Sequence, residues 1–146
     1  NNTIATLTVS IKEELTLNGT EQGGEYVMSA SVTQCYKRIV TCTTTAQSVL
    51  LFAAADAAGT LKDGTADYIR ITNLDSTNFV MLRVVGAATQ FWVKLEAGDS
   101  WVGGNSLMYA DATGTAVAAS GSFIPIDAIY ADANIGSCDV EIFAAL

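Results

Sequence analysis

The residue types that carry out most enzyme chemistry are scarce in this chain of 146 residues, which has three cysteines and no histidine. Without imidazole there is no Ser-His-Asp or Cys-His nucleophile pair and no His-ligated zinc or iron site. Cys35, Cys42 and Cys138 are an odd number without C-x-x-C spacing, which does not indicate a disulfide framework or a four-cysteine zinc site. We therefore expect no metal, no cofactor and no catalytic site, with the thiols serving as small buried apolar groups in a reducing compartment.

Fifteen acidic side chains could still supply paired carboxylates, but most of them fall at the ends of expected strands, where Asp bonds its own backbone in turns. The segment from Asp56 to Asp67 contains three Asp residues, yet it lacks the spacing and the terminal Glu of a calcium loop. A glycosidase needs two carboxylates at a set separation across a cleft, which sequence spacing does not identify. These residues therefore give no reason to expect an enzyme.

The charge balance argues against binding to nucleic acid or to an anionic membrane. The chain has seven basic and 15 acidic residues, which gives a net charge of -8. Nucleic-acid affinity depends instead on clustered Lys and Arg. The longest apolar run, Val49 to Ala55, is far shorter than the roughly 18 residues that indicate a membrane-spanning helix. The mean hydropathy of +0.34 is high, and it favours either apolar surface buried against neighbouring proteins or an alanine-rich ordinary core.

Alternation of apolar and polar residues predicts short β-strands along nearly the whole chain. Residues 3–11 place Leu7, Val9 and Ile11 on one face, and the turn pair Asn18-Gly19 follows. Further strand segments are expected at 26–33, 36–45, 49–52, 67–73, 78–86, 91–98, 99–104, 106–112, 123–133 and 138–146. A short helix over residues 53–58 is the one helical alternative. Many short strands separated by turns predict an all-β fold, a single antiparallel β-sandwich of jelly-roll-like or immunoglobulin-like type that forms one domain over residues 1–146.

Three central segments share a regular division into two faces. One parity is consistently apolar and is expected to face the core: Ile69, Ile71, Val80, Leu82, Val84, Phe91, Val93 and Leu95. The opposite parity mixes aromatic, Met and basic side chains, the types that are enriched at the centres of protein interfaces. We predict a protein-docking surface made of Tyr68, Arg70, Phe79, Met81, Arg83, Trp92 and Lys94. The alternative is that this face is buried inside the sandwich or covered by the chain's own loops, with the basic stems reaching solvent.

The expected strand pairing brings these side chains together. A hairpin closed over residues 74–77 places Arg70 opposite Met81 and Tyr68 opposite Arg83, which avoids the like-charge pair that a two-residue loop would create. A second hairpin closed over 86–89 places Arg83 opposite Trp92 and Met81 opposite Lys94. The guanidinium of Arg83 can then lie on the indole of Trp92.

Several stretches of the chain resemble a known group of proteins. These are YIRITNLDSTNFVMLR at 68–83, YKRIVTCTTT at 36–45, FWVKLEAGDSW at 91–101, and IDAIYADA with the final CDVEIFAAL. Together they resemble small β-rich virion proteins of tailed phages, particularly those of marine and cyanobacterial hosts. The resemblance covers most of the chain after Tyr36 and contains no catalytic motif, so no individual site residue carries over.

This resemblance implies a structural protein of the virion, assembled in the cytoplasm of the bacterial host. It implies a capsid cement or decoration protein, or a tail or head-to-tail component, whose partners are copies of itself, as a trimer or other homo-oligomer, and the major capsid protein or another virion protein. A carbohydrate-binding module at a tail or fibre tip is the alternative, with Trp92, Trp101 or Tyr109 stacking on sugar rings. An enzyme comes third.

Overall fold

In a computed structural model, the described part of the chain comprises residues 3–55, 57, 59–62, 64–86, 90–103 and 126–146, and it contains strands and no helix. The all-β prediction is confirmed for these residues, while the expected strand at 106–112 lies outside them. The chain divides into two compact units, Asn1–Gln34 and Cys35–Leu146. The described strands before Cys35 pair only with one another. The expected single domain over 1–146 stays a prediction.

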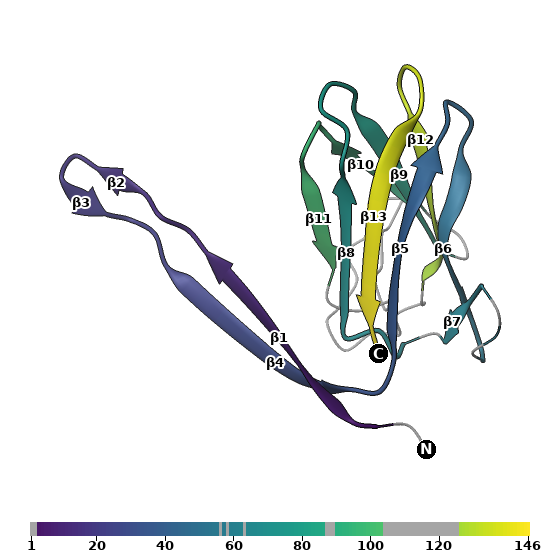
Figure 1. The fold of residues 1–146 in the computed structure, drawn as a ribbon, viewed down its shortest axis with the longest axis horizontal. Coiled ribbons are helices and arrows are strands. Elements are labelled where there is room, and N and C mark those ends of the chain that lie inside the picture. Colours follow the sequence, from purple (N-terminus) through teal and green to yellow (C-terminus); the bar gives the residue numbers. More distant parts are fainter. Residues whose placement is uncertain (1–2, 56, 58, 63, 87–89, 104–125) are drawn as a thin grey trace, which may run out of the picture. The chain divides into compact units, whose positions relative to one another are not determined.

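The first unit is a long β-hairpin (Figure 1). Strand β1 (Ala5–Lys12) pairs with β4 (Glu25–Val32), and at the tip β2 (Thr16–Leu17) pairs with β3 (Thr20–Glu21). Asn18 and Gly19 both take positive φ, 52° and 79°. The type I′ hairpin turn requires this conformation at both positions, so the turn predicted from the Asn-Gly pair is confirmed.

The second unit consists of two sheets (Figure 1). The front sheet has the strand order β11-β8-β13-β5, and the back sheet has the order β10-β9-β12-β6-β7. The front strands are β5 (Cys35–Cys42), β8 (Tyr68–Asn73), β11 (Ser100–Gly103) and β13 (Cys138–Ala145). The back strands are β6 (Gln47–Ala53), β7 (Leu61–Lys62), β9 (Val80–Gly86), β10 (Gln90–Leu95) and β12 (Ile126–Ala133). All pairs are antiparallel except the short pair β6 and β7.

The antiparallel pairs of the second unit are nested along the chain. The β9–β10 pair is innermost, and it is enclosed in turn by the pairs β8–β11, β6–β12 and β5–β13. Two further pairings, β9 with β12 and β8 with β13, join these nested pairs into the two sheets. The chain of the second unit is thus a long antiparallel ribbon that is rolled up, with its first strand beside its last.

The two sheets bury one common hydrophobic core. Ile69, Ile71 and Ile142 of the front sheet and Leu82 and Ile129 of the back sheet are completely buried. All the apolar positions predicted for the central strands belong to this core or pack against it. The alternation therefore predicted correctly which side chains of these strands face the core, because successive side chains of a strand point to opposite faces. The alternative helix at 53–58 is absent from the described part of that segment, where β6 ends at Ala53 and Ala57 forms an isolated bridge.

One buried polar side chain, Asn73, ties two connections together at one end of the two-sheet unit. Its amide nitrogen lies 2.9, 3.1 and 3.2 Å from the carbonyl oxygens of Asn78, Leu95 and Glu96. Its amide oxygen accepts a hydrogen bond from the backbone N–H of Asp75 at 3.0 Å. A buried amide is tolerated when its polar atoms are bonded in this way. Asn73 therefore fixes the connection after β8 against the connection after β10.

The expected hairpin with a loop at 74–77 does not form. Strand β8 lies in the front sheet and β9 in the back sheet, so the connection after Asn73 crosses from one sheet to the other. Arg70 has Val102 and Phe143 as its neighbours across the strands, and Met81 is not among them. The prediction was wrong because alternation shows which face of a strand is buried, whereas a short connection can either return within a sheet or cross to the second one.

Two of the three cysteines are buried, and all three are free thiols. Cys42 of β5 lies directly opposite Cys138 of β13 in the front sheet, inside the core, while Cys35 is exposed. Burial, and next to it the neighbouring Cys138, raises the pKa of the Cys42 thiol to about 11. The predicted use of thiols as small core groups is thus confirmed for Cys42 and Cys138.

We expect Asn73→Ala to lower the free energy of unfolding of the two-sheet unit by about 2 to 3 kcal/mol, because it leaves buried carbonyl groups without a donor. Both tryptophans lie in this unit, so denaturant unfolding followed by tryptophan fluorescence measures the effect. Thr77→Ala is the control, since Thr77 is exposed in the same connection. Equal unfolding midpoints for the two variants would contradict the assigned role of Asn73.

We expect N-ethylmaleimide to label Cys35 alone in the folded protein and all three cysteines after denaturation. The thiolate is the reactive form, and Cys42 combines burial with a raised pKa. Mass spectrometry of intact protein and of its peptides counts the adducts and places them. Labelling of Cys42 or Cys138 at the rate of Cys35 would show that the front sheet opens at this edge.

Candidate docking surfaces

The outer face of the back sheet carries most of the predicted docking residues. Arg83 of β9 lies opposite Trp92 of β10, and Met81 lies opposite Lys94, as the sequence predicted. The register between β9 and β12 adds Tyr130 beside Arg83. We call the group formed by Phe79, Met81, Arg83, Trp92, Lys94 and Tyr130 the back-sheet surface.

The cations of the back-sheet surface lie on aromatic rings. The Arg83 guanidinium carbon is 4.5 Å from the ring centroid of Tyr130 and 5.7 Å from that of Trp92. Lys94 Nζ lies 4.2 Å from the centroid of the Phe79 ring. Such contacts hold long basic side chains in place while their charges stay accessible. Trp92 is 51% exposed, so an indole of large area is available to a partner.

The other two predicted residues, Tyr68 and Arg70, belong to a different surface. Both lie on β8, at positions that alternate with the core residues Ile69 and Ile71, and therefore on the outer face of the front sheet. Tyr68 packs edge-on against Phe143, with 5.9 Å between ring centroids, and it is only 9% exposed. The single predicted surface is thus two surfaces on opposite sheets, because β8 and β9 do not pair.

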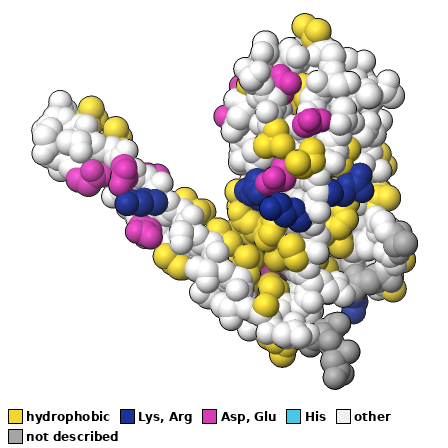
Figure 2. Space-filling model, in the orientation of Figure 1, with side chains coloured by type: hydrophobic (Ala, Val, Ile, Leu, Met, Phe, Trp, Pro, Cys, Tyr) yellow, Lys and Arg dark blue, Asp and Glu magenta, His cyan; other side chains and the backbone are white. Residues whose placement is uncertain are grey.

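A row of four outward side chains crosses the front sheet from edge to edge. The register places Lys37, Phe143, Arg70 and Val102 side by side on β5, β13, β8 and β11. Ile39 lies on the same face and is 58% exposed. Figure 2 shows Lys and Arg side chains in dark blue among yellow apolar ones across this face. We call Lys37, Ile39, Arg70, Val102 and Phe143 the front-sheet surface.

Arg70 is held in the front-sheet surface by an ion pair. Its Nη2 donates to Oε1 of Glu141 at 2.5 Å, and its Nη1 donates to the Thr72 hydroxyl. Thr72 in turn contacts the Ser100 hydroxyl at 2.7 Å, which extends the network to the edge strand. The hydrogen bond from Arg70 lowers the pKa of the Glu141 carboxyl. A single fixed Arg therefore joins three strands of the front sheet.

Sequence reasoning missed Tyr130, Lys37, Ile39 and Phe143. The alternation in 126–133 and 138–145 places Tyr130 and Phe143 on outward positions, so their faces could have been assigned from the pattern. Their neighbours could not, because sheet order sets which strands lie side by side. That order depends on pairings between residues 40 or more positions apart.

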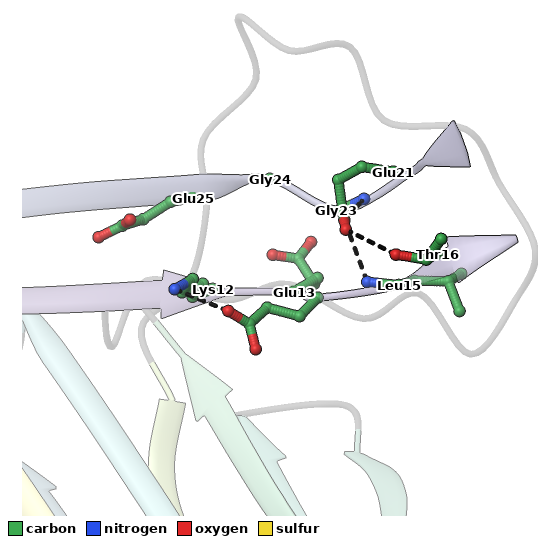
Figure 3. A pocket seen from close by; sticks show the side chains of 9 residues that line it. Lys12, Glu13, Leu15, Thr16, Glu21, Gly23, Gly24 and Glu25 are labelled. Atoms are coloured by element: carbon green, nitrogen blue, oxygen red, sulfur yellow. Dashed lines mark hydrogen bonds and ion pairs between the residues drawn. The ribbon is translucent and has the colours of Figure 1, made fainter. Parts of the chain in front are cut away.

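The tip of the hairpin forms an open hollow (Figure 3). Glu21 reaches across it, accepting hydrogen bonds from the N–H groups of Gly23 at 2.7 Å and Leu15 at 3.1 Å and from the Thr16 hydroxyl at 3.2 Å. These bonds lower the pKa of the Glu21 carboxyl. A side chain at Gly23 would collide with the Glu13 carbonyl oxygen, 1.9 Å from an added Cβ, so this position requires glycine. Glu21 thus serves as a structural brace of the tip.

The described residues hold no cluster that suggests a bound metal ion. Among them, no three His, Cys, Asp or Glu side chains come together as a metal site. The segment from Asp56 to Asp67, compared above with a calcium loop, includes Asp56 and Asp63, which lie outside the described residues. Trp101 packs against the core, and Tyr109 also lies outside the described residues.

No helix in the described part of the chain is long and apolar enough to cross a membrane.

Comparison of the chain with protein-family models, with curated proteins and with solved structures gave no match.

We expect Arg70→Met to raise the pKa of Glu141 toward the ordinary value of a glutamate. A carboxylate whose pKa is lowered by folding stabilises the fold above its unfolded pKa, and this contribution is lost as the pH falls through the folded pKa. The stability difference between wild type and variant should therefore shrink on acidification. Carboxyl NMR titration follows Glu141 directly. Lys94→Met is the control, because it removes an ion pair of the back sheet, Lys94 with Glu96, and leaves the front sheet intact. An unchanged Glu141 titration in Arg70→Met would refute the assignment.

Proposed function

We propose that this chain is a non-enzymatic structural protein of a phage particle, a capsid cement or decoration protein that stabilises the shell through protein–protein contacts. The observation that carries the proposal is the back-sheet surface, where a half-exposed Trp and two ring-bound cations share one sheet face. Its partners are the major capsid protein or another virion protein, together with copies of the chain itself. The place of action is the virion, after assembly in the cytoplasm of the bacterial host.

The finer form of the fold that we propose is a jelly-roll sandwich. The nested order of the pairs β9–β10, β8–β11, β6–β12 and β5–β13 supports this form over the immunoglobulin type, because a jelly roll is an antiparallel ribbon rolled into two four-stranded sheets. Jelly rolls occur in viral capsid proteins and in lectins. The fold alone therefore favours particle assembly or sugar binding, and the surface decides between them.

The composition of the back-sheet surface supports a protein partner. Trp, Tyr and Arg are the residues that contribute most of the binding energy in protein interfaces, and here Arg83 lies against both aromatic types. The lowered carboxyl pKa values also have structural causes: Glu21 braces the hairpin tip, Asp75 accepts N–H groups in a turn, and Glu141 pairs with Arg70. These shifts give no support to an acid–base catalyst.

Sugar binding at a tail or fibre tip is the second candidate, because Trp92 presents half of its area to solvent. Of the three aromatics considered for stacking on sugar rings, Trp92 alone is exposed among the described residues, and Arg83 lies over its ring. A row of coplanar exposed rings would favour this candidate. A tail or head-to-tail position is an alternative placement that uses the same protein-binding surface.

The proposal predicts that purified protein binds capsids assembled from the major capsid protein of the phage that encodes it. Trp92→Ala combined with Arg83→Glu should weaken this binding by about tenfold or more, since it removes the centre of the back-sheet surface. Co-sedimentation over a concentration series measures the affinity, and the melting temperature of the capsid reports stabilisation of the shell.

Ile135→Ser is the matched control, because Ile135 is 68% exposed and lies in the turn between β12 and β13. It should bind capsids as the wild type does. Equal capsid affinity of the Trp92 and Arg83 double variant would overturn the docking role of the back sheet. Specific binding on a glycan array without capsid binding would favour the sugar-binding candidate instead.

A further inference from the structure

Two cysteines form the end rung between the first and the last strand of the two-sheet unit. Strand β5 pairs with β13 from Cys35 opposite Ala145 to Cys42 opposite Cys138, and Figure 1 shows the two strands side by side. Both thiols of the end rung are free, and both belong to the core, with exposed fractions of 0% for Cys42 and 1% for Cys138. The rung therefore places two thiols on the same face of neighbouring strands.

The spacing of this rung fits a disulfide bond. Residues directly opposite each other in an antiparallel pair have Cα atoms about 4.5 to 5.5 Å apart, depending on the type of rung. The Cα atoms of disulfide-bonded cysteines lie about 4.4 to 6.8 Å apart. Cys35 is at the opposite end of β5, roughly 23 Å from Cys42 along the strand. Among the three cysteines, Cys42 and Cys138 are thus the pair that can be bridged.

Contacts on either side hold the two strand ends in this register. On the outer face, the hydroxyl of Thr41 donates a hydrogen bond to Oδ1 of Asp139 at 2.7 Å. The backbone N–H of Ala133 donates to the carbonyl oxygen of Thr43 at 2.8 Å. The backbone N–H of Leu74 donates to the carbonyl oxygen of Asp139 at 2.9 Å. The residues next to both cysteines are therefore fixed, which keeps the two thiols opposite each other.

The buried thiols lie next to exposed turns. Residues 43–46 follow Cys42, residues 134–137 precede Cys138, and all of these turn residues are exposed. Strand ends open locally at a lower free-energy cost than the centre of a sheet. A small reagent can therefore reach this rung by fraying of the ladder end, without unfolding of the two-sheet unit. Burial and the pKa of Cys42, raised to about 11, keep the reactive thiolate scarce, so we expect a slow reaction.

We propose that Cys42 and Cys138 form a redox-modification site, at which a small-molecule disulfide such as glutathione disulfide oxidises the two thiols to an intramolecular disulfide bond. One cysteine thiolate attacks the small disulfide, which forms a mixed disulfide and releases one small thiol. The second cysteine thiolate attacks the protein sulfur of the mixed disulfide, which forms the Cys42–Cys138 bond and releases the second small thiol. The two protons of the cysteines pass to the released thiols, and the small disulfide takes up the two electrons.

This bond closes the two-sheet unit covalently. Strands β6 to β12 all lie between Cys42 and Cys138 in the chain. A cross-link over so long a loop stabilises the fold mainly by restricting the unfolded chain. Sequence spacing gave no sign of the pair, because its members meet only through the pairing of the first strand with the last. The inference goes beyond the proposed function and does not depend on it, since the front sheet alone carries it.

Refolding in a glutathione redox buffer tests the site without relying on access to the folded core. The protein is the full chain with Cys35→Ser, which removes the exposed thiol. Acid quenching and mass spectrometry measure the constant for forming the intramolecular disulfide against glutathione, once in native buffer and once in denaturant. We expect folding to raise this constant by about a hundredfold, because a cross-link that stabilises the fold is itself favoured by the fold. An equal or lower constant in native buffer would overturn the inference.

A shifted pair of cysteines is the matched control. Cys35→Ser with Cys138→Ala and Val140→Cys keeps two thiols on the inward faces of β5 and β13, but residue 140 lies opposite Val40. Diagonal neighbours of this kind are about 7 to 8 Å apart, which is beyond the reach of a disulfide. Folding should therefore not raise the constant of the shifted pair. A rise equal to that of the native pair would contradict the assigned rung.

Thermal unfolding gives a second readout of the same bond. The oxidised Cys35→Ser protein should melt on the order of 10 °C above its reduced form, and reduction with dithiothreitol should reverse this shift. Cys35→Ser with Cys42→Ala cannot close the bond and should gain no stability in oxidising buffer. Persistent glutathione adducts, disulfide-linked dimers or an oxidised form that melts below the reduced one would each refute the proposed bond.

Discussion

The pairing of the last strand between two much earlier ones is the constraint on which the two-sheet unit depends. Strand β13 is hydrogen-bonded to β5 on one side and to β8 on the other. Without it β5 would have no neighbour in the front sheet, β8 would keep only β11, and Ile142 and Val140 would leave the core. The same strand places Glu141 beside Arg70 and Phe143 beside Tyr68. One strand therefore contributes to both the core and the front surface.

The two outer faces differ in how their charges are held, and this difference suits separate partners. On the back sheet, Arg83 lies on aromatic rings, which leaves its charge free to meet an acidic surface. Lys94 lies on the Phe79 ring and also pairs with Glu96. On the front sheet, Arg70 is neutralised by Glu141, while Lys37 and Ile39 lie on the edge strand. In the proposed function, one face would contact the shell and the other a neighbouring virion protein. The hairpin supplies the third surface, which is apolar on one side.

The sequence predicted the local structure well because side-chain alternation and turn residues are local signals. The inward positions Ile69, Leu82 and Val84, the Asn18-Gly19 turn and the register that sets Arg83 opposite Trp92 were all correct. The assignment of strands to sheets was not predictable in this way. Arg70 was placed opposite Met81 and Tyr68 opposite Arg83 because a short connection looks the same whether it returns within a sheet or crosses the core.

The separate hairpin was also missed, for a related reason. A strand that alternates between apolar and polar residues shows that one face is to be covered, but it does not say by what. Leu7, Val9 and Ile11 therefore looked like sandwich residues, although the structure pairs their strand only with β4. Arg83 lies between Trp92 and Tyr130, and only one of these two contacts could be predicted from the sequence. The Trp92 contact follows from a hairpin, and the Tyr130 contact requires the distant strand β12.

The central claim is that this chain is a structural part of a phage particle, held there by its sheet faces. Cryo-electron microscopy of the particle from the phage that encodes the chain tests it most directly, at a resolution that traces the backbone. The account predicts copies of the two-sheet unit on the shell, with the back-sheet surface against a neighbouring virion protein. Particles whose density is complete without this chain, although the protein is made during infection, would contradict the account.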